Sequence, residues 1–192
     1  AEARARFRTL TSERNGTLHT WEILPAEPGD VEGLTIDAAV FGTGPRVLIV
    51  SSGLHGIEGF AGSAIQLDFI RHRLPSDLRV VVLHALNPYG MKHRRRVNER
   101  NVDLNRNFLP EGEPYRGSTP EYRRLNTLLN PARPTGGIDF MLLQTAAQIA
   151  IHGFTSLKAA VVLGQYDYPA GLYFGGKRLE DGPAGRRTAP SL

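Results

Sequence analysis

The sequence contains no cysteine, no long apolar run and no marked excess of charge of one sign. The lack of cysteine excludes a disulfide framework and thiolate metal ligands, so a bound metal would have to use histidine, aspartate or glutamate. It is compatible with a reducing compartment, and we expect a cytoplasmic protein. No apolar stretch approaches the roughly 20 residues that cross a bilayer, and residues 1–8 lack the apolar centre of a signal peptide. We therefore expect no membrane partner.

The charge balance argues against nucleic acid as a partner. The formal net charge is +4 and the pI is about 9.7. The one dense basic cluster, residues 92–96, has no aromatic residues interleaved with it, as a nucleic-acid surface would. A mildly basic enzyme with an anionic substrate is the simpler interpretation.

Length and patterning predict one α/β domain over residues 1–192, in which 1–16 form an arm or short helix and 177–192 a loop or tail. Alternating or continuous apolar runs predict four strands, and apolar residues at helical spacing predict a helix that Pro75 ends. The continuous run of the third strand suggests a buried, central position. The strand–helix–strand order over 46–86 implies parallel pairing, hence a twisted, mostly parallel or mixed sheet flanked by helices. The predicted strands are 18–24, 34–41, 46–51 and 78–86, and the helix face carries Phe60, Ala64, Leu67, Ile70 and Leu74.

The second half of the chain is less regular. Residues 87–117 read as a long irregular segment, which is uncommon unless it is functional. A helix capped by Ser118 or Thr119 is expected to run to about Leu129, and a longer apolar helix is expected over 138–163. We expect His84, within the fourth strand, to be packed in the core, and His152 to be a core or surface histidine, rather than metal ligands.

A glycine-rich turn at residues 51–59 follows the third strand and carries two potential metal ligands, His55 and Glu58. Such a turn lies at the carboxyl end of a sheet, where open α/β folds build their sites. Imidazole and carboxylate suit zinc, which in catalytic sites keeps one position open for water. The alternative is an exposed histidine beside a glutamate that favours a helix N-terminus.

Four further motifs follow His55-Gly56-Ile57-Glu58 in order. Together they resemble the zinc carboxypeptidase family, with its His-x-x-Glu metal pair, Asn-Pro-Asp-Gly turn, Arg-Lys-Asn element and Val-Asp-Leu-Asn-Arg-Asn-Phe block. Downstream elements such as Gly164-Gln165-Tyr166 look more like an uncharacterised bacterial branch near succinylglutamate desuccinylase and aspartoacylase. The motifs are Asn87-Pro88-Tyr89-Gly90, Arg96-Val97-Asn98, Val102-Asp103-Leu104-Asn105-Arg106-Asn107-Phe108 and Pro114-Tyr115-Arg116-Gly117.

The resemblance implies that His55 and Glu58 bind Zn²⁺. It implies that Arg96 polarises the scissile carbonyl and stabilises the oxyanion, and that Asn105 and Arg106 hold the substrate's terminal carboxylate. Alternatives remain for each residue. Arg94 or Arg95 could take the role of Arg96, and Asn105 and Arg106 could simply brace their loop. We expect Asp103 to orient the loop or a metal-bound histidine rather than to act as a base.

Two departures from the family pattern affect the prediction. Tyr89 stands where the family has aspartate, and no third histidine ligand or catalytic glutamate is recognisable; Glu180 sits in the polar tail. We therefore expect the third ligand and the base to lie beyond Leu192. An incomplete sheet would leave an exposed edge through which copies could associate.

The function implied is a zinc-dependent hydrolase that cleaves an amide bond next to a free carboxylate. Its substrate would be a peptide C-terminus or an N-acyl amino acid. The alternatives are an N-acyl amino acid deacylase of the aspartoacylase type and a non-catalytic carboxylate-binding module.

Overall fold

The computed structural model describes residues 2–72, 74–75, 77–131, 146–147, 158 and 162–180. The chain divides into two compact units, unit 1 with Ala1–Glu99 and Asp181–Leu192 and unit 2 with Arg100–Glu180. Each unit is described by itself below, and the single domain expected from the sequence stays a prediction. The expected helix over 138–163, with His152, and the tail after residue 180 fall largely outside the described residues.

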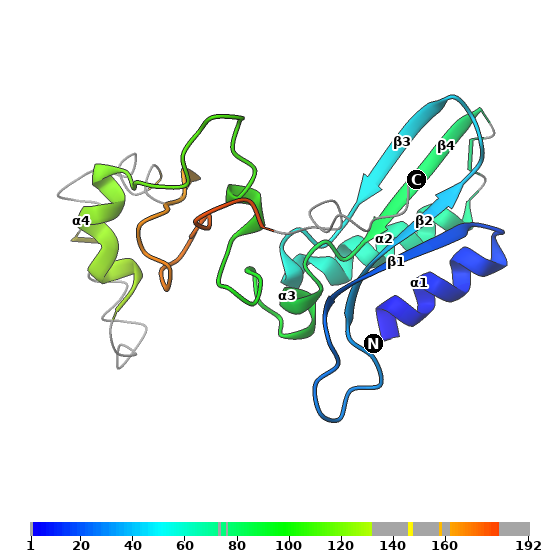
Figure 1. Cartoon of the computed structure of the whole chain (residues 1–192), viewed down its shortest axis with the longest axis horizontal. Helices are drawn as coiled ribbons and strands as arrows, with labels where there is room; N and C mark the ends of the chain where they lie inside the picture. The colour runs from blue at the N-terminus through cyan, green and yellow to red at the C-terminus, as the bar shows by residue number, and fades with distance from the viewer. Residues whose placement is uncertain are drawn as a thin grey trace. The chain divides into compact units, whose positions relative to one another are not determined.

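Unit 1 is built on a mixed four-stranded sheet, which confirms the predicted α/β class (Figure 1). The strand order is β1-β2-β4-β3. β1 and β4 are antiparallel to β2, whereas β3 and β4 are parallel, from Arg46↔Leu78 to Ser51↔Leu83. The crossover between these two strands is α2, as the strand–helix–strand order predicted. The strands are β1 Thr17–Leu24, β2 Leu34–Phe41, β3 Arg46–Ser51 and β4 Leu78–His84.

The predicted central position of β3 is wrong for the described sheet. β3 pairs with β4 alone, and its side chains are mostly exposed, with Val47 55% and Ile49 63% accessible. β4 is the strand between two neighbours, and Val80 and Val82 are fully buried. The continuous apolar run therefore predicted the strand correctly, but it did not predict the position of the strand in the sheet. The association of copies through such an edge stays a prediction.

Two helices cover one face of this sheet, α1 (Glu2–Glu13) and α2 (Gly59–Arg71). Phe7 of α1 and Ile70 of α2 are fully buried in one core with residues of β2 and β4. The predicted apolar face of α2 is partly wrong, because Phe60 and Ala64 are exposed while the buried face includes polar side chains. The buried residues of α2 are Gly59, Ser63, Gln66, Leu67 and Ile70.

α1 is also attached to β2 by an ion pair between the half-buried Arg8 and the buried Asp37. Arg8 donates to both carboxylate oxygens of Asp37, at 2.6 and 3.1 Å, and Asp37 is 1% exposed. This contact raises the pKa of Arg8, chiefly through the hydrogen bond to Asp37. A buried carboxylate requires such a partner, so the pair fixes the position of α1 on the sheet.

The segment expected to be irregular, 87–117, contains two short helices, α3 (Pro88–Lys92) in unit 1 and η2 (Leu104–Arg106) in unit 2. In unit 2, α4 (Pro120–Leu129) begins as predicted, because the Thr119 side chain accepts a hydrogen bond from the Tyr122 amide and Pro120 occupies the first turn. The fully buried Tyr122 packs with Leu125, and its hydroxyl donates to the Leu172 carbonyl at 2.7 Å. Among the described residues, no helix has both the length and the apolar character needed to cross a membrane.

Candidate functional site

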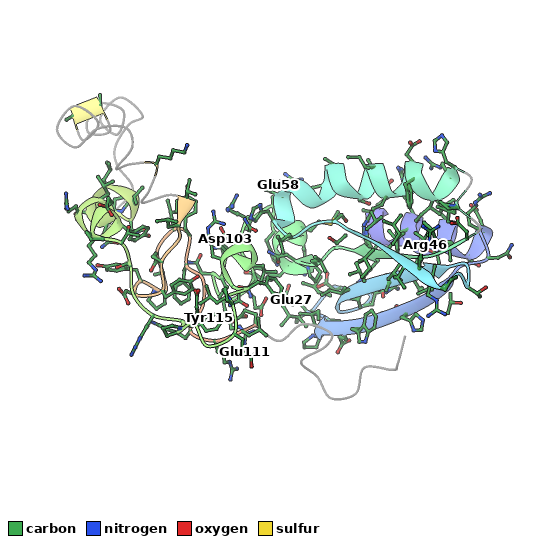
Figure 2. The ribbon with its side chains drawn as sticks, turned by 90° about the horizontal axis from the view of Figure 1, so that it is seen from above. Glu27, Arg46, Glu58, Asp103, Glu111 and Tyr115 are labelled. Atoms are coloured by element: carbon green, nitrogen blue, oxygen red, sulfur yellow. The ribbon has the colours of Figure 1, made fainter. Side chains whose placement is uncertain are left out.

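The turn that follows β3 carries two of the predicted site residues. Gly53 has φ +70°, a conformation that favours glycine, and a short 3-10 helix, η1 (Gly56–Glu58), leads directly into α2. His55 is the residue before η1 and Glu58 is its last residue, at the N-terminal end of α2 (Figure 2). The three-residue spacing on one helical turn therefore brings the two side chains to the same side.

The side chains of His55 and Glu58 meet in space. His55 Nδ1 lies 3.1 and 3.2 Å from the two Glu58 carboxylate oxygens. The His55 side chain is 12% exposed and that of Glu58 is 65% exposed. Two ligand atoms on one tetrahedral zinc ion lie about 3.4 Å apart. The observed separation is that of a hydrogen bond and is also compatible with two ligand atoms on one zinc ion, for which imidazole and carboxylate are suitable donors.

The described residues do not complete a metal site. No group of three histidine, aspartate or glutamate side chains within them could hold a metal ion. Structural zinc sites have four protein ligands and catalytic sites three. A third ligand would have to come from outside the part of the chain that the structure describes.

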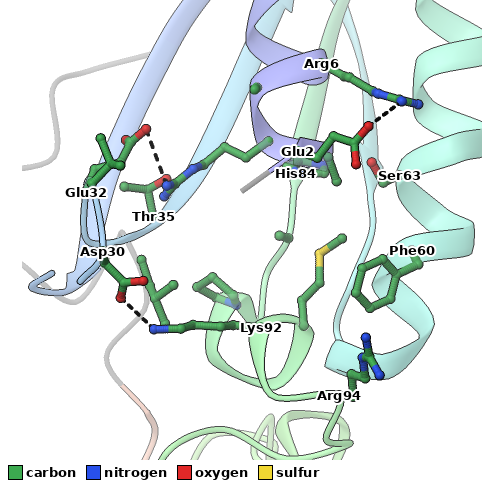
Figure 3. A pocket seen from close by; sticks show the side chains of 18 of the residues that line it. Glu2, Arg6, Asp30, Glu32, Thr35, Phe60, Ser63, His84, Lys92 and Arg94 are labelled. Atoms are coloured by element: carbon green, nitrogen blue, oxygen red, sulfur yellow. Dashed lines mark hydrogen bonds and ion pairs between the residues drawn. The ribbon is translucent and has the colours of Figure 1, made fainter. Parts of the chain in front are cut away.

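Arg96 lies beside this pair. Its Nη1 is 3.9 Å from Glu58 Oε1, and the Arg96 side chain is 38% exposed. Of the neighbouring arginines, Arg94 lines a pocket on unit 1 whose wall also includes Phe60 (Figure 3). The structure thus brings together three of the five predicted site residues, namely His55, Glu58 and Arg96.

The turns after β3 and β4 are in direct contact, which explains this juxtaposition. The Ile57 amide donates to the Arg95 carbonyl at 3.0 Å. A Cβ at Gly56 would lie 2.0 Å from the Gly90 carbonyl carbon, so the two backbones approach as closely as only glycine permits. Asn87 strengthens the second turn, since its side chain accepts from the Gly90 amide at 2.8 Å and donates to the Arg96 carbonyl at 3.2 Å.

The other two predicted site residues, Asn105 and Arg106, lie on η2 in unit 2. Asn105 is exposed, whereas Arg106 is half-buried and its stem packs against Gly164, where a Cβ would lie 2.7 Å from Arg106 Cδ. Arg106 Nε is buried and has no hydrogen-bond partner within the described residues. The carbonyl of Arg106 accepts from the Tyr166 hydroxyl at 2.7 Å. Burial is the main cause that raises the pKa of Tyr166.

Two buried polar residues hold the η2 segment in place. Asp103 is fully buried, and its side chain accepts from the Asn105 amide at 3.0 Å, so it orients the loop as expected. Asn107 is 1% exposed and donates to the carbonyls of Gly175 and Arg178, both at 2.8 Å. The Asn107 side-chain oxygen accepts from the Glu180 amide at 2.7 Å. Glu180 in turn forms an ion pair with Arg100, and its side chain is 10% exposed, so it does not belong to a solvated tail.

A pocket of about 1010 Å³ lies on unit 1 between α1, α2, α3 and the start of β2 (Figure 3). At its rim Lys92 donates to Glu27 and Asp30 at 2.7 and 2.6 Å. The hydrogen bond from Lys92 lowers the pKa of Asp30, and the same contacts raise the pKa of Lys92. His84 also lines this pocket.

His84 has the structural role that was expected. It is 2% exposed and stacks on Phe7 with 4.7 Å between the ring centroids. Burial lowers the pKa of His84 to about 4, so the ring is neutral at physiological pH. Its Nδ1 lies 3.3 Å from the side-chain oxygen of Gln66. The sequence analysis did not identify Gln66 as a buried residue. Its position on the same helical face as Ser63, Leu67 and Ile70 could have indicated this burial.

These observations define an α/β domain with a histidine, a glutamate and an arginine gathered where two parallel strands end. The chain belongs to a family described as "Protein of unknown function (DUF2817)", which matches residues 1–182. No curated protein matches it.

Three solved structures show similarity to the chain, each described as a "putative metallopeptidase". They come from Shewanella denitrificans, Shewanella amazonensis and Shewanella baltica, with sequence identities of 22%, 19% and 19% and a TM-score of 0.40 in each case. The matches cover 83%, 83% and 79% of this chain and 47%, 51% and 50% of the solved chains. This chain therefore spans about half the length of these structures.

Proposed function

We propose that this chain carries part of the active site of a zinc-dependent hydrolase that cleaves an amide bond next to a free carboxylate. The observation that carries the proposal is the cluster of His55, Glu58 and Arg96. His55 Nδ1 is 3.1 Å from Glu58 Oε1, and Arg96 Nη1 is 3.9 Å from the same oxygen. A metal-ligand pair beside a guanidinium is the combination that metal-assisted hydrolysis needs.

The residues of the cluster have distinct proposed roles. His55 and Glu58 would hold the metal ion, which when bound supplies an activated water and a Lewis acid for the carbonyl. The Arg96 guanidinium would donate hydrogen bonds to the carbonyl oxygen as it gains negative charge. The hydrogen bonds that Ile57 and Asn87 make to the backbone at residues 95 and 96 would keep that donor in position. Pre-positioned donors of this kind contribute because they do not have to reorganise during the reaction.

The resemblance of residues 102–108 to the family motif would give Asn105 and Arg106, in unit 2, the role of binding a free carboxylate. The guanidinium of arginine matches a carboxylate with two parallel hydrogen bonds, which lysine cannot provide. Asp103, Asn107 and Tyr166 hold the backbone of this segment, so the side chain of Arg106 is presented from a supported turn.

Within the described residues no third metal ligand joins His55 and Glu58. The proposal requires that the complete protein supply this ligand and the general base. Two alternatives share the carboxylate-binding part of the proposal. An N-acyl amino acid deacylase would use the same groups on a smaller substrate. A non-catalytic module would bind the carboxylate without hydrolysis.

The proposal is tested by measuring how fast the full-length protein hydrolyses two peptides that differ only at the C-terminus. We expect a peptide with a free C-terminal carboxylate to be hydrolysed and the same peptide with an amidated C-terminus to resist. Hydrolysis of N-acetylated amino acids but not of peptides would favour the deacylase. Saturable binding of the free-carboxylate peptide without hydrolysis would favour the module, and equal cleavage of both peptides would contradict carboxylate selection.

A further inference from the structure

Gln66 is a buried polar residue on α2 whose side chain bridges the ends of two strands. It is 1% exposed. Its Nε2 lies 2.8 Å from the Leu83 carbonyl of β4 and 3.4 Å from the Val50 carbonyl of β3. Its Oε1 lies 2.8 Å from the Ser52 hydroxyl and 3.3 Å from His84 Nδ1. Packing alone does not explain a glutamine at this buried position, because an apolar side chain of the same length would fill the space without needing hydrogen-bond partners.

The two carbonyls fix the direction of this amide. A carbonyl only accepts hydrogen bonds, so the group that faces Leu83 and Val50 must be the NH₂ of Gln66. Its oxygen therefore faces Ser52 and His84, and both of these must donate. His84 must then carry its proton on Nδ1, and the neutral ring agrees with the lowered pKa of His84, about 4.

The position of the bridge connects it to the turn after β3. Ser52 is the first residue beyond that strand; its amide donates to the Leu83 carbonyl at 3.1 Å, and its carbonyl accepts from Leu86 at 3.0 Å. Gly62, one helical turn before Gln66, lets α2 approach closely, since a Cβ there would lie 2.7 Å from Ser52 Cβ. Ser52 is thus held by β4 on one side and by α2 on the other. Three residues later the same turn presents His55.

We propose that Gln66 is a positioning residue for the metal-binding turn. Its amide joins β3, β4 and α2 at the point where the turn starts, and through Ser52 it fixes the direction in which the backbone leaves β3. His55 follows Ser52 by three residues in the same turn, and Glu58 is the N-cap residue of α2, the helix that carries Gln66. This inference rests on the proposed function, because it assigns Gln66 a role toward the metal ion that His55 and Glu58 would hold.

The test compares two variants of the full-length protein that both remove a buried group from α2. Gln66→Met keeps the side-chain length and removes all four hydrogen bonds. Ile70→Ala removes apolar packing one turn further along the helix, where Ile70 is fully buried, and touches none of these bonds. Zinc affinity is measured by competition with a chromophoric chelator, and thermal stability is measured in parallel.

We expect Gln66→Met to weaken zinc binding about 10- to 100-fold, the range for residues that orient metal ligands. Ile70→Ala should lower thermal stability while its zinc affinity stays within about twofold of the wild type. An unchanged zinc affinity in Gln66→Met would overturn the inference but leave the proposed function standing. If the wild-type protein itself binds no zinc, the proposed function fails, and this role of Gln66 fails with it.

A second readout does not involve the metal. Nitrogen-15 NMR of the His84 ring in metal-free protein should show the Nδ1–H tautomer in the wild type and a changed tautomer balance in Gln66→Met. A wild-type ring protonated on Nε2 alone would contradict the bridge. Should Gln66→Met not fold, Ser52→Ala removes only the hydroxyl donor and should weaken zinc binding in the same direction; no change in that variant would count against the proposal.

Discussion

The backbone amide of Ile57 donates a hydrogen bond to the carbonyl of Arg95 over 3.0 Å. These residues are 38 positions apart in the sequence, yet each is a direct neighbour of a predicted site residue, Glu58 and Arg96. The bond forms because β3 and β4 run parallel and their following turns emerge at the same end of the sheet. The backbone contact between these two turns in unit 1 therefore holds the segments that carry Glu58 and Arg96 next to each other.

Replacing Gly56 with alanine should disrupt this contact. The added Cβ would lie 2.0 Å from the carbonyl carbon of Gly90, so the two turns must separate. We expect a loss of about 1–3 kcal/mol in the free energy of unfolding, together with weaker zinc binding. Gly29→Ala is a control for a loss of stability without a clash, because the φ of Gly29 is +93°, which strains an alanine, while nothing lies within 4 Å of its Cβ position. Equal zinc affinities in the two variants would show that the contact between the turns does not matter for the site.

The choice between Arg96 and Arg94 as the oxyanion donor can be tested through catalysis. Arg96→Met should lower kcat about 100- to 1,000-fold, the cost of removing an oxyanion donor, and leave zinc content unchanged. Arg94→Met is the matched control, since Arg94 lines the pocket on unit 1, and its kcat should stay within a few-fold of the wild type. The reverse outcome would assign the oxyanion role to Arg94. Both measurements require the full-length protein with a peptide substrate that has a free carboxylate.

The buried His84 should make unit 1 less stable in acid. Burial lowers its pKa from 6.5 to about 4, with Asp37 opposing the shift and Arg4 and Arg8 adding to it. Between these two values the unfolded chain binds a proton that the folded chain does not. The free energy of unfolding should therefore fall as the pH drops from about 6.5 to about 4, by up to about 3 kcal/mol from this group.

Urea unfolding at several pH values measures this effect. His84→Asn is the comparison, because its side-chain amide can donate to Gln66 in place of Nδ1 but does not titrate. The variant should lose part of the pH dependence in that window. An identical pH dependence in both proteins would mean that other groups account for it.

Asn107 should be essential for the local structure of unit 2. Asn107→Asp removes both donors to the Gly175 and Arg178 carbonyls and places a charge at a position that is 1% exposed. We expect a loss of at least about 2 kcal/mol in the stability of this unit. Asn105→Asp makes the same chemical change at an exposed position and should alter stability by less than about 0.5 kcal/mol. Urea unfolding of the wild type and both variants measures these losses, and an Asn107→Asp variant as stable as the Asn105→Asp variant would contradict the role of Asn107.

The sequence predicted the elements of unit 1 well, because strong local signals mark them. The strands over 34–41 and 46–51 were predicted with the observed bounds, and the parallel pairing of β3 with β4 followed from the helix between them. The position of β3 could not be predicted, since a continuous apolar run does not say how many neighbours a strand has. The short helix α3 was missed because its five residues give no periodic pattern, although Asn87 and Pro88 are typical of a helix start.

The candidate site was predictable in part. The motifs named His55, Glu58 and Arg96, and the structure gathers these side chains in unit 1. Gln66 was not found, because glutamine on a helix is usually exposed and only the burial of its helical face shows otherwise. The contact of Gly56 with Gly90 could not be predicted from the sequence either, because it depends on how two turns that are distant in the sequence meet.

The central claim is that His55 and Glu58 are metal ligands, and zinc content tests it most directly. Elemental analysis of the full-length protein, purified without added metal, should find about one zinc per chain. His55→Ala and Glu58→Gln should each bring this close to zero, while Arg96→Met should retain it. Full zinc content in His55→Ala and Glu58→Gln, or no zinc in the wild-type protein after incubation with Zn²⁺, would contradict the account.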